Sequence, residues 1–405
     1  MGVGFSVFAS TVLALESPSS EERFKKIEDQ LTTLRDENQQ LRQQLGVESK
    51  SPAAFARAAG KEQRFAVGGY LQSQVEFGSA PDNRFAGIND RFLIRRARLN
   101  VAGRFVEQFD FKLEGDFGNN SIAGKTGYSA QLTDGFINWN RYDFANIKFG
   151  QFKTPFGYEQ LLADTKTLTA ERSLVNDRLT LSRQIGLGVS GNFFTNRLGY
   201  SVGMFNGNNI NNGANDDDHF QYVGRLTGVP IQTRWAGQDV KLSLGFNGYY
   251  SKDTSVSGLS SADQRFDSTA TAGVNDLFAG RRAGWGVDTQ FKWGRFDMLA
   301  EILGAHFDPV SGNNTVATTD DSFDALGFSV LGGFYVCPKV QAIVRYETLN
   351  MNRNLSGNST EEWTFGVNYY IKGDDIKLQF NYLFGSPLGG LDNQGRFIAR
   401  AQIIF

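Results

Sequence analysis

Sixteen stretches of this chain alternate apolar and polar residues with a period of two, and this pattern constrains the fold more than any other feature. In one of them, Ile376, Leu378, Phe380, Tyr382 and Phe384 share a face. Because successive side chains of a strand point to opposite sides, each stretch predicts a strand with one apolar and one polar face. The predicted strands are 65–77, 92–105, 107–117, 130–141, 145–153, 184–193, 198–206, 219–227, 240–250, 284–293, 295–306, 326–336, 339–349, 361–371, 376–384 and 396–405.

The predicted strands and their connections fit a membrane better than a soluble sandwich. Most strands have about the 10 residues that a tilted strand needs to cross a bilayer. Long polar connections alternate with mostly short ones, such as "RYDF", "TNR", "CPK" and "KGDD". The long connections are 78–91, 118–129, 154–183, 207–218, 251–283, 307–325, 350–360 and 385–395. This alternation predicts an all-β fold, a transmembrane antiparallel β-barrel of about 16 strands.

Aromatic residues mark the ends of several predicted strands, where amphipathic rings suit the membrane–water interface. They are Trp139, Tyr200, Trp285, Trp293, Trp363, Tyr369 and Phe405. The final stretch, "RFIARAQIIF", resembles the C-terminal sorting signal of bacterial outer-membrane proteins. In a soluble protein, so many outward apolar faces would need a second sheet to cover them.

The region before the barrel divides into three predicted segments. Residues 1–17 resemble the apolar part of a secretory signal, which favours export. Residues 21–45 form three heptads, with Phe24, Leu31, Asn38 and Leu45 at a and Ile27, Leu34 and Leu41 at d. This pattern predicts an N-terminal coiled-coil helix, the alternative being a single amphipathic helix packed on its own domain. Residues 46–62 are predicted to be a linker and residues 63–405 the barrel.

Composition excludes several classes of function. The formal net charge of -2 argues against a general nucleic-acid binder. The single Cys337 and two distant histidines, His219 and His306, make a zinc site improbable. No nucleophile–base–acid constellation is visible, so we expect a protein that is not an enzyme and has no cofactor.

Positive charge is concentrated on one predicted strand, "RFLIRRARLNVAGRF" at 91–105. By alternation, Arg96, Arg98 and Arg104 face the barrel lumen, where planar guanidinium groups could guide phosphate oxygens. The simpler alternative is that lumen-facing positions are polar in any such barrel, so that arginines there need no ligand. Arg95 shares its face with Leu99 and should point to lipid. Either a bulge near 94–96 reverses it, or Arg95 lies at the outer rim.

Three stretches of the chain are similar to the phosphate-selective porin O and P family. They are "RRARLNVAGRF" (95–105), "KFGQFKTPFGYEQL" (148–161) and "ERSLVNDRLTLSRQIGLGVSGNFFTNRLGYSVGMFNGNN" (171–209). The resemblance covers about 65–405 and weakens after 210. It implies a homotrimer of sixteen-strand barrels and a third loop, here 154–183, that folds inward to narrow the pore. It also implies an arginine ladder that maps onto Arg95 and Arg96.

Further cations complete the predicted anion pathway. Lys112 faces inward on the neighbouring strand, Lys153 begins the inward loop, Arg172 lies inside it, and Arg183 ends it. The resemblance implies lysines that select phosphate near the constriction, and Lys112 and Lys153 match them by position. The family's later ladder arginines have no clear counterpart here, because Arg225 stands alone. Inward acids should offset part of this charge, namely Asp110, Glu114, Asp116, Asp134, Asp288 and Glu347.

These patterns favour an outer-membrane porin of a diderm bacterium, a passive water-filled channel for anions such as phosphate or related oxyanions. Its partners would be outer-membrane lipid and two further copies of the chain. The alternative is a structural anchor, with a periplasmic coiled coil that contacts peptidoglycan or another envelope layer.

Overall fold

A computed structural model describes the barrel and its main connections. It covers residues 56–57, 64–105, 108–118, 122, 128–215, 217–257, 277–310, 322–386 and 392–405. The predicted signal-like segment, the heptads and most of the linker lie outside the described residues. Among the described residues, no helix is long and apolar enough to span a membrane.

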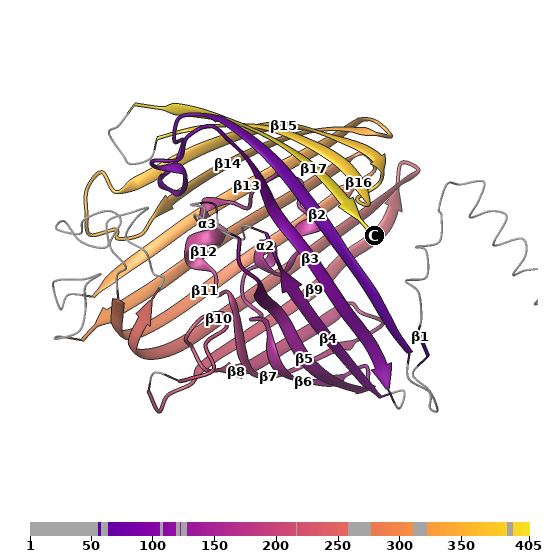
Figure 1. Cartoon of the computed structure of the whole chain (residues 1–405), viewed down its shortest axis with the longest axis vertical. Helices are drawn as coiled ribbons and strands as arrows, with labels where there is room; N and C mark the ends of the chain where they lie inside the picture. The colour runs from indigo at the N-terminus through magenta and orange to yellow at the C-terminus, as the bar shows by residue number, and fades with distance from the viewer. Residues whose placement is uncertain are drawn as a thin grey trace, which may run out of the picture. The chain divides into compact units, whose positions relative to one another are not determined.

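All sixteen predicted strands are present and form a closed antiparallel barrel, β2 to β17, among the described residues (Figure 1). The two-residue strand β1 (Ala56–Arg57), which was not predicted, pairs with the start of β2. The barrel strands are β2 (Arg64–Gly78), β3 (Arg91–Phe105), β4 (Phe109–Asp116), β5 (Gln131–Tyr142), β6 (Ala145–Lys153), β7 (Arg183–Phe193), β8 (Leu198–Phe205), β9 (Gln221–Trp235), β10 (Gln238–Ser257), β11 (Leu277–Trp293), β12 (Phe296–Pro309), β13 (Phe323–Cys337), β14 (Val340–Asn350), β15 (Ser359–Lys372), β16 (Ile376–Gly385) and β17 (Gln394–Ile404).

The first and last predicted strands close the barrel, as expected. Strand β17 pairs with β2, with Ile398 opposite Glu76 and Gln402 opposite Gln72. The alternation of faces is also confirmed. Outward side chains such as Leu99, which is 48% exposed, are apolar, whereas inward ones such as Gln72 are polar and buried. Closure leaves no free edge around the wall, which is what a strand-built membrane protein requires.

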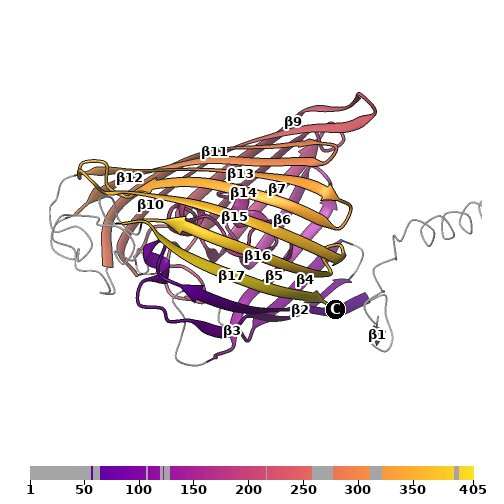
Figure 2. The same ribbon diagram turned by 90° about the horizontal axis from the view of Figure 1, so that it is seen from above.

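Strands β9 and β10 extend well beyond their predicted ends. Their hairpin turns at Ala236 and Gly237, both with positive φ, and Figure 2 shows it projecting past the neighbouring turns. Pro230 lies within β9, although proline cannot donate a ladder hydrogen bond. A β-bulge accommodates it, since Gly228 pairs with Leu244 but Ile231 pairs with Leu242.

The connection between β6 and β7 lies inside the barrel, as the resemblance implied. It contains α2 (Tyr158–Leu161), η2 (Asp164–Lys166) and α3 (Leu174–Leu179). Helix α3 contacts β12, β13 and β14. Its apolar side joins an apolar cluster within the lumen that includes Val175, Leu179, Leu303, Phe307 and Leu349. We call residues 154–182 the inward loop. Burial of its apolar side chains in this cluster holds the loop against the barrel wall.

A second connection also folds inward. Between β2 and β3, the short helix η1 (Asn83–Phe85) is capped by the Asp82 side chain, which accepts a hydrogen bond from the Arg84 amide. Phe85 is buried with Ile398, Leu383 and Ala170, the last of which belongs to the inward loop. The connection that precedes β3 therefore packs onto the inward loop.

Candidate functional site

A β-bulge in β3 places Arg95 and Arg96 on the same side of the wall. Gln72 of β2 pairs with Arg96, while the next residue, Ser73, pairs with Ile94, so Arg95 has no partner in the ladder. Both guanidinium groups consequently lie inside the barrel, and the two residues are 4% and 5% exposed. The bulge is the correct one of the two alternatives that the sequence left open.

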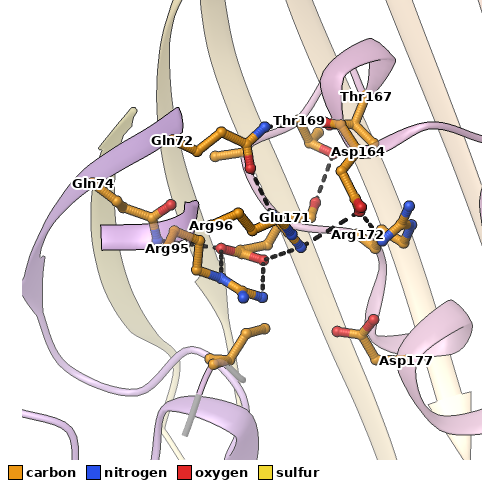
Figure 3. Close-up of polar contacts among 12 residues, drawn as sticks. Gln72, Gln74, Arg95, Arg96, Asp164, Thr167, Thr169, Glu171, Arg172 and Asp177 are labelled. Atoms are coloured by element: carbon orange, nitrogen blue, oxygen red, sulfur yellow. Dashed lines mark hydrogen bonds and ion pairs between the residues drawn. The ribbon is translucent and has the colours of Figure 1, made fainter. Parts of the chain in front are cut away.

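Arg95 and Glu171 connect the bulge to the inward loop (Figure 3). Arg95 Nε and Nη2 donate to the two Glu171 carboxylate oxygens at 2.8 and 2.9 Å. Arg400 of β17 reaches the same carboxylate and also donates to Gln74 Oε1 at 2.8 Å. Burial alone would raise the pKa of Glu171, but Arg95, Arg400 and Arg96 hold it well below its usual range.

Asp164 is a second loop carboxylate fixed by arginines. Arg98 Nη1 lies 2.8 Å and Arg96 Nη2 3.6 Å from its oxygens, and Arg172 of the loop itself lies 2.5 Å away. The Tyr70 hydroxyl donates to Asp164 at 3.2 Å. Burial alone would raise the pKa of Asp164. The positive charges of Arg172, Arg96 and Arg98 outweigh burial and hold this pKa well below its usual range.

The inward cations of the adjacent strands are paired with wall carboxylates. Lys112 lies 2.8 Å from Glu114 and 2.7 Å from Asp134. Arg183, the first residue of β7, donates from Nε to Asp134 at 2.7 Å. Arg98 also reaches Asp116 at 2.9 Å. The predicted inward acids therefore fasten the cationic side chains to the wall.

Two predicted site residues have other surroundings. The Lys153 ammonium donates to the backbone carbonyls of Gln160 and Leu162 at 2.7 and 2.8 Å, which fixes the first turn of the inward loop. The Arg104 side chain is 59% exposed near the short-turn end of β3 and pairs with Asp110 at 2.8 Å. The ion pair of Arg104 with Asp110 therefore lies apart from the ion pairs that hold the inward loop.

Strands β14 to β17 also hold the inward loop, through residues that sequence reasoning did not single out, apart from the predicted inward acid Glu347. Glu347 Oε2 accepts hydrogen bonds from the Leu174 and Val175 amides at 2.5 and 3.3 Å, and Glu347 Oε1 lies 2.9 Å from Arg345. Arg345 Nη1 in turn donates to the Glu171 carbonyl at 2.9 Å. Side chains of Asn368, Lys377, Gln379, Asn381 and Gln402 also bond to loop backbone atoms.

Arg84 of η1 links the two inward connections and was also missed. Its guanidinium lies 2.9 Å from Asp82 and 2.7 Å from Asp177, and it donates to the Arg172 carbonyl at 2.9 Å. The only sequence signal was a charged pair in a polar connection, a pattern that solvated loops commonly show.

The cationic wall carries more positive than negative groups. Its side chains, joined to one another by ion pairs, are seven cations and five carboxylates. The cations are Arg95, Arg96, Arg98, Lys112, Arg172, Arg183 and Arg400, and the carboxylates are Glu114, Asp116, Asp134, Asp164 and Glu171. The formal surplus of this set is therefore two positive charges. We call these twelve residues the cationic wall. In the described parts of the chain, no group of side chains could hold a metal ion.

A closed barrel with apolar outer faces, a polar lining and a loop folded into its lumen is the architecture of an outer-membrane channel. The sequence profile of the family described as "Phosphate-selective porin O and P" matches residues 65–385. The chain belongs to this family. No curated protein matches it significantly.

Solved outer-membrane barrels share its fold at low sequence identity. The anion-selective porin from Comamonas acidovorans has a TM-score of 0.56 at 11% identity, over 85% of this chain and 100% of that chain. The outer-membrane channel DcaP of Acinetobacter baumannii has a TM-score of 0.55 at 14% identity, over 87% and 100%. OmpT of Vibrio cholerae, solved in its trimer form, has a TM-score of 0.54 at 12% identity, over 85% and 100%.

Proposed function

We propose that this outer-membrane channel conducts small anions passively through a water-filled lumen, and that phosphate and related oxyanions are among them. The charge surplus of the cationic wall supports this proposal. A narrow lumen with low-dielectric walls focuses the field of nearby charges, whereas exposed charges beyond about 8–10 Å are screened at physiological salt. The charge beside the inward loop therefore matters more than the net charge of -2.

The pairing of the arginines defines how they would act. Because Arg95, Arg96 and Arg98 all contact loop or wall carboxylates, they would attract anions mainly through their summed field. Attraction without tight ligation suits a channel, since an ion must leave as readily as it enters. The Comamonas barrel, described in its title as anion-selective, adds support by likeness of fold.

A salt-gradient measurement tests the proposal directly. The reversal potential of the channel in a KCl gradient should show a preference for chloride. Replacing both Arg96 and Arg98 by Ala removes two positive charges, as many as the surplus of the cationic wall, and should reduce this preference. The control is Asp218→Asn, an exposed loop acid, which should leave it unchanged. A wild-type channel that prefers potassium, or no preference at all, would sink the proposal.

We further propose that the protein is a homotrimer, with the heptads of residues 21–45 in the periplasm. A trimer form is named for the Vibrio barrel, and a three-stranded coil would match that symmetry. The mass of the detergent-solubilised full chain should be that of three copies, and deleting 21–45 should weaken the assembly. A monomeric full chain would contradict this.

The heptads also favour a second role, that of an envelope anchor through peptidoglycan. Co-sedimentation of the full chain with purified peptidoglycan, compared with the deletion variant, tests it. Equal sedimentation of the two would remove the reason to assign the heptads this role.

A further inference from the structure

A small polar pocket opens on the lumen wall of β7, β8 and β9, near the short-turn end of the barrel. The inward side chains that line it are those of Ser190, Asn192, Ser201, Arg225 and Thr227. The ladder places them side by side. Ser201 of β8 is opposite both Ser190 and Arg225, and Gly199 of β8 is opposite both Asn192 and Thr227. Three neighbouring strands therefore contribute polar groups to one hollow.

Gly199 lets side chains of β7 and β9 meet above β8. A Cβ added to Gly199 would lie 2.6 Å from Thr227 Oγ1 and 3.0 Å from Asn192 Oδ1. Both polar ends therefore lean over the glycine from opposite sides, and a larger residue would push them apart. The convergence of the two side chains depends on the absence of a side chain between them.

Two aromatic rings fill the next inward positions toward the outside. Gly188 of β7 and Gly203 of β8 pair with each other there. A Cβ added to Gly188 would lie 3.1 Å from the Phe152 ring, and one added to Gly203 would lie 2.6 Å from the Phe205 ring. The two rings pack edge to face, 5.3 Å apart. The pocket therefore has an apolar border beside its polar groups, a combination typical of small-molecule sites.

The protein does not use the polar ends in the pocket. Within the part of the chain that the structure describes, the side chains of Ser190, Asn192, Ser201 and Thr227 make no hydrogen bond or ion pair. The inward amides nearer the outside differ, since Gln184 of β7 donates to Gln221 of β9 at 2.9 Å. Hydroxyl and amide groups can both donate and accept, so the pocket offers donors and acceptors together.

The pocket carries no net charge. Arg225 is the only charged residue that lines it, and its guanidinium reaches over Gly245 to pair with Asp288 at 2.7 Å. An anion would favour an uncompensated cation, and this cation is compensated. A neutral solute rich in hydroxyl groups matches the pocket better, because each of its hydroxyls also donates and accepts.

We propose that this pocket binds a small neutral hydroxylated solute, with the chemistry of a monosaccharide, as the solute passes through the lumen. The inference goes beyond the proposed anion channel. The pocket lies at the opposite end of β7 from Arg183 and needs none of the charges of the cationic wall. The channel would then serve two classes of solute, anions drawn by the field of the wall and neutral molecules retained by hydrogen bonds.

Planar-bilayer recordings of the full-length channel, with glucose as the probe, test the pocket. Glucose should reduce the KCl current by more than the bulk conductivity falls, and the reduction should saturate. Replacing Ser201 by Ala and Thr227 by Val removes two hydroxyl groups and no charge. This double variant should raise the half-saturating glucose concentration by about three- to ten-fold per hydrogen bond lost and should keep the chloride preference unchanged.

Ser243→Ala is the matched control, because Ser243 is also a partly buried inward serine, on β10, but lies outside the pocket. It should leave the glucose effect unchanged. Gly199→Ala removes no polar group but fills the space between Asn192 and Thr227, and should also weaken the glucose effect. Heat-modified gel mobility reports whether each variant has a folded barrel. The double variant keeps the outline of the side chains and is the one to rely on if Gly199→Ala does not fold.

The outcomes separate the two proposals. A wild-type current that falls only with the bulk conductivity overturns the pocket, whatever the anion preference. An unchanged half-saturating concentration in the double variant, or an equal rise in Ser243→Ala, also overturns it. If the double variant weakens block by inorganic phosphate and not by glucose, the pocket holds an oxyanion and the proposal is wrong. A channel that responds to glucose as described but lacks anion preference would support the pocket and overturn the proposed function.

Discussion

Arg95 and Glu171 form a bidentate ion pair, and Arg95 is the bulged residue of β3, opposite which the ladder with β2 shifts its register. The β-bulge lets the Arg95 side chain turn inward beside Arg96, and the Glu171 carboxylate lies within ion-pair distance of both guanidinium groups. A local irregularity of the wall and the placement of the inward loop therefore depend on each other.

Replacing Glu171 by Gln should loosen the inward loop. The change leaves Arg95, Arg96 and Arg400 buried without that carboxylate, and removing one partner of a buried ion pair costs about 3–5 kcal/mol. We expect a folded barrel with higher single-channel conductance and more current noise. Glu361→Gln, an exposed residue of β15, is the control. Unchanged conductance and noise would show that Glu171 does not hold the loop.

The attachment of the loop through Asp164 and Glu171 should be insensitive to mild acid. Folding depresses the pKa of Asp164 and of Glu171, so their contribution to stability is complete above the ordinary carboxyl range and is lost only as pH falls through the depressed values. The extra current noise of Glu171→Gln over the wild type should therefore be the same at every pH from 8 to about 4 and should shrink only below it. A rise in noise at pH 5–6 that persists in Asp164→Asn would place the sensitive group elsewhere.

Gly157→Ala should displace the start of the inward loop. Gly157 has φ of 77°, and an added Cβ would lie 2.5 Å from Thr180 Cγ2. The strain should lower the free energy of unfolding by about 1–3 kcal/mol, measured by urea denaturation. Thr180→Ala should relieve only part of it, because the backbone strain remains. Gly213→Ala, where the space is open, should be neutral. Full recovery in the double variant would mean that contact alone, and not φ, is responsible.

Gly327→Ala should push α3 away from β13. The added Cβ would lie 2.6 Å from Val175 Cγ1, inside the buried cluster, and overpacking costs about 1–3 kcal/mol. Gly332→Ala on the same strand meets nothing closer than 3.9 Å and serves as the control. Val175→Ala combined with Gly327→Ala should recover stability. If the combined variant is no more stable than Gly327→Ala alone, α3 does not pack as described.

The barrel could be predicted because its signal is local. In β16 and β17 every second residue faces lipid, and that pattern is readable within about ten residues of sequence. The bulge at Arg95 breaks the same pattern by one residue, and an arginine is compatible with the lumen or with the outer rim. The sequence could therefore present both alternatives and had no means to choose between them.

The partners of the arginines could not be predicted because they are distant in the chain. Glu171 lies 76 residues from Arg95 and 229 from Arg400, in a connection without periodicity. Its carboxylate is indistinguishable in sequence from a solvated loop acid. Only the inward course of the loop, which came from the family resemblance and not from the pattern, brings these groups together.

The spread of the loop's anchors along the chain has a consequence for how the protein is assembled. The Leu174 amide is held by Glu347, 173 residues later, and the Ala170 amide by Asn381, 211 residues later. These contacts can form only after the last strands have reached the first ones. Folding should therefore pass through a closed barrel whose lumen is still wide, and docking of the inward loop, which narrows the lumen, should be a later and kinetically separate step.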